Sequence, residues 1–422
     1  MHGQHLGGSW QWHRFRVDVV RWLVGVVFIA GIGVAYAQPS YSDIPGCTEG
    51  ALPSNDPRYP AAQLIVTCAP TQSAPVQWNG VLIVVVHGYV EPQQPLTLPT
   101  PDMNGLSTVR VLMNLGFAVA TSSFHKNGYA VEQGGSDINA LVRHFNSTVA
   151  PARHVLLFGG SEGGLITAML IERNPELYAG GLALCGPLGG ANVEVDYLTD
   201  FRAVFDYFFP EVFDFGAVGV PASAAQNWAG YETLIRSALA ANPRALEQIF
   251  RVTGVPRDSA DPDATTEATL GLLRYNVIGT NDLLQVAGGN PYDNRNRNYA
   301  GSDNDAALNQ GVERVAADPS ARTYLTQFYQ PTGRLQRPLV TLHTRRDPVV
   351  PFEHALLYAR AVDQAGAHSQ FVGLVVDRYG HCNFETGEVL GALAILVDRA
   401  DIPLSAALRA YRSAIEAQLR NR

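Results

Sequence analysis

The chain has 422 residues, of which 46% are hydrophobic and 16% are charged, and its 30 basic and 38 acidic side chains give a formal net charge of −8. This is the composition of a globular protein with enough apolar side chains for a large core, so wholesale disorder is excluded. The net negative charge and the lack of long basic runs argue against a nucleic-acid partner.

The first 37 residues differ in composition from the rest of the chain. Basic side chains gather at residues 13–21, an uncharged apolar run covers residues 22–34, and Ala35-Tyr36-Ala37 places small residues where a signal peptidase acts. We therefore predict a signal peptide over residues 1–37 and a mature protein that is secreted or periplasmic, with no membrane contact after cleavage. The alternative is a retained anchor, but this run is shorter than the roughly 20 apolar residues that span a bilayer.

Beyond residue 60, short apolar runs alternate with amphipathic stretches, which is typical of strands and helices around a largely parallel sheet. The predicted fold class is therefore α/β, with a mostly parallel twisted sheet flanked by helices. We predict strands over residues 81–86, 117–122, 154–158, 181–184, 338–343 and 370–376, and helices over residues 107–115, 136–145, 164–173, 353–365, 387–399 and 405–420.

This alternation of strands and helices stops between the fourth and fifth of these strands. Residues 188–337 are mainly helical and aromatic in character, and roughly 150 residues are too many for a loop inside a compact domain. We predict that they form a helical cap subdomain. The core would then consist of a first part over residues 38–187 and a second part over residues 338–422.

One motif follows the predicted strand over residues 154–158. Gly159-Gly160-Ser161-Glu162-Gly163 matches the pattern G-x-S-x-G, in which a strained turn from strand to helix presents a serine hydroxyl above the sheet. The pattern alone is weak, but here a strand precedes it and a helix follows it. Ser161 is therefore the candidate nucleophile, and the alternative is a glycine turn with a purely structural serine.

A serine hydroxyl becomes a good nucleophile only when a base takes its proton and a third group orients that base. Asp347 follows the predicted strand over residues 338–343, and His381 follows the strand over residues 370–376. Ser161, Asp347 and His381 thus occur in the chain order nucleophile, acid and base. Asp377 is an alternative acid, but it lies on the same connection as His381.

Three other histidines are alternative bases, and backbone groups complete the predicted site. His343 is expected to be a buried core residue, His354 to begin the next helix, and His87 to stabilise a turn after the strand over residues 81–86. Acyl transfer also needs donors for the oxyanion. We predict that the backbone N–H groups of Tyr89 and Glu162 supply them.

With these motifs the sequence resembles the α/β-hydrolase superfamily over about residues 60–420. The resemblance rests on His87-Gly88 after a strand, the turn at Ser161, Asp347-Pro348-Val349-Val350-Pro351, and Gly380-His381. It is closest to secreted bacterial serine esterases and prolyl-oligopeptidase-like hydrolases with a cap insertion. Tannase and feruloyl esterase relatives also follow their histidine with a cysteine, which pairs with a cysteine directly before the serine. This chain has Gly160 at that place.

Four cysteines lie beyond residue 37, and they allow three disulfide pairings, among which the sequence alone does not choose. Cys47 and Cys68 are close along the chain, which favours a bond between them. The resemblance implies that Cys185, at the end of a strand, lies near Cys382 and pairs with it. A zinc site is disfavoured because no pair of cysteines has ligand spacing.

Two features of the predicted cap leave alternatives open. Its aromatic side chains either line an acyl pocket or form the core of the cap itself. The polar loop over residues 288–309 is expected to be a solvated turn, since it lacks the pattern of an EF-hand calcium loop. The aromatic residues are Tyr197, Phe201, Phe205, Tyr207, Phe208, Phe209, Phe213 and Phe215, and the polar residues considered for calcium are Asp293, Asn296, Asn298, Asp303 and Asp305.

The predicted function is that of a secreted serine hydrolase that cleaves carboxylic esters through an acyl-enzyme. It would need no metal or organic cofactor, and its partner would be a small-molecule or polymeric ester. The alternatives are an amidase or peptidase with the same triad, and a non-catalytic binding protein on a hydrolase fold.

Overall fold

The computed structural model describes residues 13–15, 41–71, 74–258 and 260–420. Except for residues 13–15, the predicted signal peptide lies outside the described residues, so it stays a prediction. None of the helices in the described ranges is long and apolar enough to cross a bilayer.

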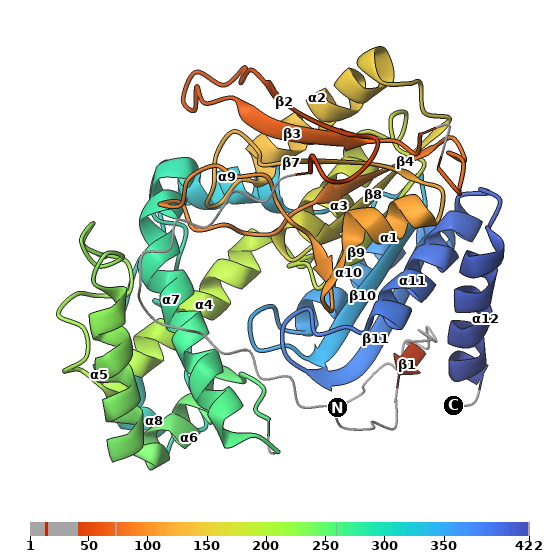
Figure 1. Cartoon of the computed structure of the whole chain (residues 1–422). Helices are drawn as coiled ribbons and strands as arrows, with labels where there is room; N and C mark the ends of the chain where they lie inside the picture. The colour runs from red at the N-terminus through yellow and green to blue at the C-terminus, as the bar shows by residue number, and fades with distance from the viewer. Residues whose placement is uncertain (1–12, 16–40, 72–73, 259, 421–422) are drawn as a thin grey trace.

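A single large sheet organises the described residues (Figure 1). Its strands follow the order β1-β11-β10-β9-β8-β4-β7-β3-β2, and all neighbours are parallel except that β3 runs antiparallel to both β2 and β7. The predicted mostly parallel sheet is confirmed. The bounds are β1 His13–Phe15, β2 Cys47–Leu52, β3 Gln63–Cys68, β4 Val81–Val86, β7 Ala118–Ser122, β8 His154–Gly160, β9 Gly180–Leu184, β10 Leu339–Arg346 and β11 Phe371–Tyr379.

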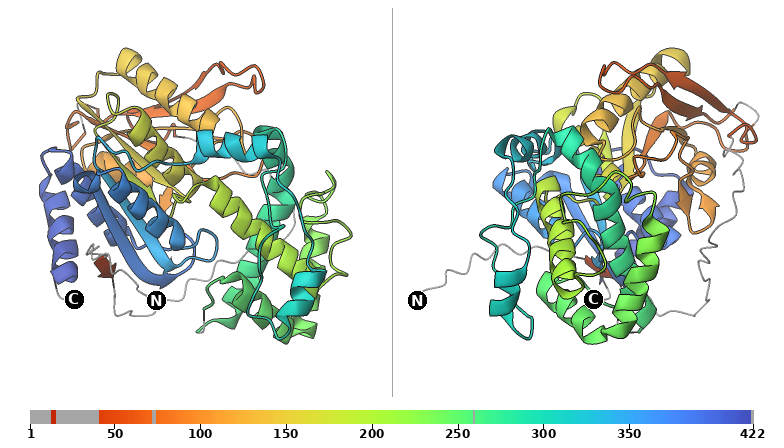
Figure 2. Two further views of the ribbon diagram at one scale, coloured as in Figure 1. Left: turned by 180° about the vertical axis from the view of Figure 1, so that it is seen from behind. Right: turned by 90° about the vertical axis from the view of Figure 1, so that its left-hand side faces the viewer.

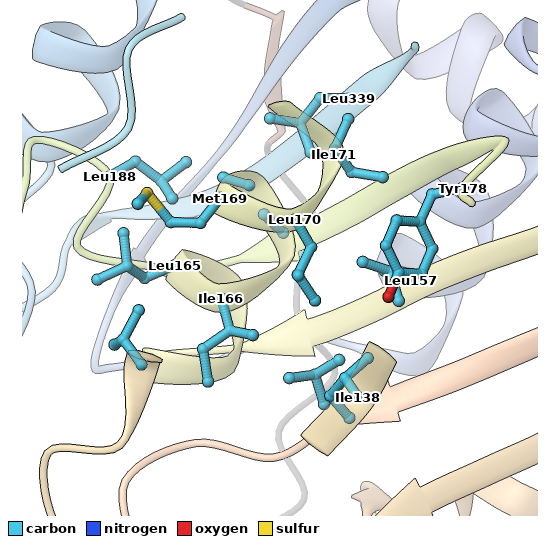
Figure 3. Packing of buried hydrophobic residues seen from close by; sticks show 14 of the residues in the cluster. Ile138, Leu157, Leu165, Ile166, Met169, Leu170, Ile171, Tyr178, Leu188 and Leu339 are labelled. Carbon is cyan, nitrogen blue, oxygen red and sulfur yellow. The ribbon is translucent and has the colours of Figure 1, made fainter. Parts of the chain in front are cut away.

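Both faces of the sheet are covered, which explains the unbroken apolar sequence of β4. All six of its side chains are buried, and they alternate between two hydrophobic clusters, one on each face. One face carries α2 (Val131–Thr148), α3 (Glu162–Arg173) and α10 (Glu353–Gln364), and the other carries α1 (Thr108–Asn114), α11 (Thr386–Arg399) and α12 (Ala406–Arg420). Figure 3 shows the packing of α3 against Ile138 of α2 and Leu157 of β8.

Several elements differ from the sequence predictions. Strands β2 and β3 were not predicted; β2 is exposed at four of its six residues and has the mixed sequence CTEGAL, so it carries no clear apolar pattern. Helix α2 begins at Val131 instead of residue 136, because its first turn is held by a distant group: the Ala130 N–H donates to Glu162 Oε1 at 2.8 Å. Two short strands, β5 (Asp102–Met103) and β6 (Leu106–Ser107), form a separate ribbon.

Six helices lie between β9 and β10, and we call residues 191–329 the helical insertion. Helices α4 to α8 stand to one side of the sheet (Figures 1 and 2) and share a hydrophobic cluster of their own, whereas α9 contributes Leu325 and Tyr329 to the cluster of the sheet. The proposed cap boundaries at residues 188 and 337 stay a prediction. The helices are α4 Ala191–Phe208, α5 Trp228–Ala241, α6 Pro243–Thr253, α7 Pro262–Ala287, α8 Asp305–Gly311 and α9 Pro319–Tyr329.

The aromatic and acidic residues that the sequence analysis named in the insertion contact other groups of the protein. All eight aromatic side chains belong to the cluster shared by α4 to α8 or pack against it. Asp293 pairs with Arg295, Asp303 pairs with Arg244 and Arg251, and Asp305 accepts from the backbone N–H groups of Gly301 and Ser302.

Candidate active site

Ser161 occupies the turn between β8 and α3. Its backbone has φ 56° and ψ −125°, a conformation that costs a non-glycine residue free energy and persists only when its surroundings enforce it. The surroundings are backbone groups: the Ser161 N–H donates to Leu184 O of β9 at 2.9 Å, and Ser161 O accepts from the N–H groups of Gly164 and Leu165. The serine side chain is thus presented at the carboxyl edge of the sheet.

Glycines allow α3 to approach the strands this closely. A Cβ atom on Gly163 would lie 2.1 Å from Val86 O and 2.5 Å from His87 O, at the end of β4. A Cβ atom on Gly159 would lie 2.1 Å from Gly163 O. No side chain fits at either position without moving backbone atoms, which agrees with the role of the glycines in the sequence motif.

The structure brings Ser161, His381 and Asp347 together. His381 Nε2 lies 2.9 Å from Ser161 Oγ, and His381 Nδ1 lies 2.8 Å from Asp347 Oδ2. Asp347 is fully buried, and its Oδ1 accepts from the N–H groups of Val349 and Val350 at 2.9 and 3.0 Å. Asp377, the alternative acid, is an exposed residue of β11.

These contacts fix the protonation of the imidazole. Because the Asp347 carboxylate can only accept at Nδ1, that nitrogen carries the proton of the neutral ring, and in this tautomer Nε2 directs a lone pair at the Ser161 hydroxyl. Burial lowers the pKa of His381, but the charge and hydrogen bond of Asp347, with a smaller contribution from Glu194, outweigh it and leave the pKa above its usual value.

The other histidines lie where the sequence predicts. His87 stacks on Phe124 with ring centroids 3.9 Å apart, and its Nδ1 lies 2.7 Å from Gly88 O in the turn after β4. His343 is buried with Nε2 2.9 Å from Val350 O, and burial lowers the pKa of both His87 and His343. His354 is the second residue of α10.

The predicted oxyanion donors border the serine. Glu162 is the first residue of α3, so its N–H has no acceptor within the helix. Gly88, which precedes Tyr89, approaches the serine closely enough that a Cβ atom on it would lie 3.2 Å from Ser161 Cβ. The assignment of the two N–H groups to an oxyanion hole stays a prediction.

Both favoured disulfides are present. Cys47 and Cys68 face each other across β2 and β3, and Cys185 is bonded to Cys382. The second bond links the residue after β9 to the residue after His381, and both of its cysteines have positive φ, 44° at Cys185 and 50° at Cys382. It therefore fixes the backbone of the loop that carries the imidazole.

A cavity of about 60 Å³ borders Ser161. The eight aromatic residues of the predicted cap do not line it; α4 instead presents Ala191, Glu194, Val195 and Leu198. Their spacing of i, i+3, i+4 and i+7 is one face of a helix, a signal that the sequence contained. The other walls include side chains of α2 and α3 and two tyrosines of the insertion, which sequence reasoning missed: Val131, Leu165, Tyr275 and Tyr329.

Two buried carboxyl groups also border this cavity. Glu162 Oε1 accepts from the Ala130 N–H, and burial raises the pKa of Glu162 to about 7. Glu194 Oε2 lies 2.9 Å from His354 Nε2. Because His354 Nδ1 accepts from the Gly189 N–H at 3.0 Å, the proton of that imidazole is on Nε2, facing Glu194. Burial raises the pKa of Glu194, and His354 opposes the shift.

The order of the strands and the positions of these side chains identify the architecture. Of the eight strands of the large sheet from β2 to β11, taken along the chain, Ser161 follows the fifth, Asp347 the seventh and His381 the eighth, and Ser161 sits in a strained turn that opens a helix. The chain has the α/β-hydrolase fold. In this α/β-hydrolase fold the insertion lies between the sixth and seventh of these strands.

Comparisons with known proteins found similar structures but no close relatives. No family model and no curated protein matches the sequence. An acylaminoacyl peptidase in complex with Z-Gly-Gly-Phe-chloromethyl ketone is 10% identical, with 86% of this chain and 43% of that chain covered and a TM-score of 0.44. This chain thus spans less than half the length of that peptidase.

Two esterases are similar over most of their own length. The Pyrococcus furiosus esterase is 11% identical, with 80% of this chain and 83% of that chain covered and a TM-score of 0.40. Brefeldin A esterase, a bacterial protein, is 11% identical, with 92% and 81% covered and a TM-score of 0.39.

Proposed function

We propose that this protein is a serine hydrolase that cleaves carboxylic esters. The observation that carries the proposal is the continuous row of hydrogen-bonding atoms from Asp347 Oδ2 through the His381 ring to Ser161 Oγ, with distances of 2.8 and 2.9 Å. The row lies at the border of a cavity, so a carbonyl group can reach the serine.

The chemistry follows from the direction of each group. Ser161 Oγ attacks the carbonyl carbon while its proton passes to His381 Nε2, and Asp347 stabilises the imidazolium that results. The N–H groups of Tyr89 and Glu162 hold the oxyanion. When the tetrahedral intermediate collapses, the carbon–oxygen bond to the alcohol breaks and the alcohol leaves with the proton from Nε2. Water then attacks the acyl-enzyme by the same route, releasing the acid and restoring the serine.

Two further parts of the proposal concern location and the insertion. The disulfides Cys47–Cys68 and Cys185–Cys382 are typical of an oxidising compartment, which supports secretion or a periplasmic location. We assign the helical insertion as the cap, since α4, α7 and α9 all contribute to the wall of the cavity beside Ser161.

The test is the Ser161→Ala variant of the mature, disulfide-intact protein, assayed with 4-nitrophenyl acetate. Loss of the nucleophile should lower kcat by roughly 10⁴-fold or more while the circular dichroism spectrum is unchanged. Ser223→Ala, at an exposed position of the insertion, is the matched control and should keep full activity. Retained activity in Ser161→Ala would remove the serine from the mechanism. The rates of hydrolysis of matched ester and anilide substrates distinguish an esterase from an amidase.

A further inference from the structure

The cavity beside Ser161 is small. Its volume of about 60 Å³ is less than half of the roughly 150 Å³ that holds a benzene molecule in a protein core. Its walls are mainly aliphatic or aromatic, with Leu165 from α3 and Val195 and Leu198 from α4. Such a space favours a short aliphatic chain over a phenyl ring.

Helix α4 determines where the cavity ends. The helix starts at Ala191, seven residues after β9 ends at Leu184, the residue whose carbonyl accepts from the Ser161 N–H. From there it leads away from the sheet into the insertion (Figure 1). At 1.5 Å per residue, Leu198 lies about 10 Å further along the axis than Ala191. Of the α4 residues that line the cavity, Ala191 is therefore nearest the end of β9 and Leu198 is farthest along the helix.

A second, larger space lies beside Gly160 and Cys382, the residues that adjoin Ser161 and His381 in the chain. It is a cleft of about 390 Å³ whose lining includes Gly88, Gly160, Pro99, Asn104 and Cys382. Cys382 Sγ lies 3.7 Å from His381 Nε2. Since this nitrogen returns the proton to the departing alcohol, the alcohol must leave from the side of the imidazole, and Cys382 connects that side to the cleft.

We propose that the preferred substrates are esters of a short aliphatic acid, with two to four carbons, and a larger alcohol. The acyl chain occupies the cavity closed by Val195 and Leu198, and the alcohol occupies the cleft beside Cys382. This inference rests on the proposed function, because it assigns the two sides of the same serine. It makes Leu198 and Ala191 residues that determine acyl specificity.

Two isomeric esters test which side of the serine accepts the larger group, the acyl side or the alcohol side. Benzyl acetate places the ring on the alcohol, whereas methyl phenylacetate places it on the acyl group, and neither ester releases a phenol. We expect kcat/KM, divided by the rate of alkaline hydrolysis of each ester, to favour benzyl acetate by about tenfold or more, since a misfit of one carbon is worth at least that much. Equal rates, or a preference for methyl phenylacetate, would overturn the inference.

Variants connect the preference to α4. Leu198→Ala should lower the ratio of benzyl acetate to methyl phenylacetate by about tenfold, whereas Leu272→Ala should not change it, because Leu272 is equally buried in the insertion but does not line the cavity. Ala191→Leu narrows the cavity near the serine and should reduce butyrate turnover relative to acetate, a readout that does not depend on enlarging the core. An unchanged preference in both cavity variants would contradict the assignment of α4.

A small fluorophosphonate distinguishes the two proposals. Labelling of Ser161 together with turnover that ignores acyl size would overturn the substrate assignment and leave the hydrolase in place. No labelling and no turnover of either ester in correctly folded protein would overturn the hydrolase, and the substrate assignment with it.

Discussion

The edge of the sheet around Ser161 is held by backbone atoms in direct contact, whereas the helical insertion is held by side chains packed against side chains. At the edge, Ser161, Cys185 and Cys382 all have positive φ, and α3 touches the carbonyl groups of β4 through Gly163. In the insertion, aromatic side chains of α4 form the centre of a separate cluster. The difference teaches that the groups of the proposed triad depend on an exact backbone path, while the proposed substrate space depends on replaceable side chains.

The largest effect is expected when one methyl group is added to the backbone at the edge of the sheet around Ser161. In Gly163→Ala the new Cβ would meet Val86 O at 2.1 Å, so α3 must move, and Ser161 moves with it. We expect a loss of about 3 kcal/mol in the free energy of unfolding and a fall of roughly 10²-fold in kcat/KM, the cost of a displacement of about 1 Å. Urea unfolding and ester hydrolysis measure the two effects.

The same substitution in the insertion gives the matched control. Gly271 lies within α7, and a Cβ atom there meets nothing within 4 Å. Gly271→Ala should therefore raise the free energy of unfolding by about 0.5–1 kcal/mol through helix propensity and leave kcat/KM unchanged. If Gly163→Ala and Gly271→Ala changed stability and kcat/KM equally, the edge and the insertion would not differ in their sensitivity to an added methyl group.

The two disulfides offer the next comparison, because only one of them lies at the edge. Removing Cys185 and Cys382 together as serines frees the loop that carries His381. We expect kcat to fall by about tenfold, less than the cost of a fixed 1 Å displacement, because the hydrogen bond from Thr344 Oγ1 to Gly380 O still holds the loop. Removing Cys47 and Cys68, on β2 and β3, should cost about 2–4 kcal/mol of stability without changing kcat.

The sequence predicts the edge of the sheet better than it predicts the contacts of the helical insertion. The proximity of Ser161, Asp347 and His381 is predictable because each follows a strand, and parallel strands bring such positions to one edge. Tyr275 and the pairing of Glu194 with His354 were not predicted, since they join elements far apart in the chain through side-chain packing. Strand β2 was missed because it is mostly exposed and lacks an apolar pattern.

A buried ion pair connects the insertion to the sheet. Lys126 Nζ lies 3.1 Å from Asp282 Oδ2 of α7, which also accepts from the Tyr129 N–H at 2.7 Å. Asp282→Asn leaves Lys126 without its counter-charge in a buried place, and we expect a loss of about 3 kcal/mol of stability but a change in kcat/KM of less than about fivefold. Asp303→Asn, in exposed pairs with Arg244 and Arg251, should cost about 0–1 kcal/mol.

If Asp282→Asn instead abolished turnover at full stability, the insertion would be part of the chemical step, and the contrast between the two regions would fail. Thermal unfolding and ester hydrolysis on the same sample decide between these outcomes.

The smallest effect is expected at Glu194, whose carboxyl group lies where the edge of the sheet meets the helical insertion. The carboxylate form of Glu194, on α4, helps to raise the pKa of the His381 imidazole. His381 acts as a base only when it is neutral, so turnover is lost as pH falls through this pKa. Glu194→Gln removes this carboxylate, so it should lower the pKa of His381 and move the acid limb of kcat/KM to lower pH.

The glutamine retains an oxygen that can accept from His354 Nε2–H, so the variant keeps the contact between α4 and α10 while it loses the charge. Glu353→Gln changes an exposed carboxyl group beside His354 and should leave the pH profile unchanged. An acid limb that moves to higher pH in Glu194→Gln would contradict the sign of this interaction. A limb that moves equally in both variants would mean that net charge, and not the position of Glu194 beside the imidazole, determines the pKa of His381.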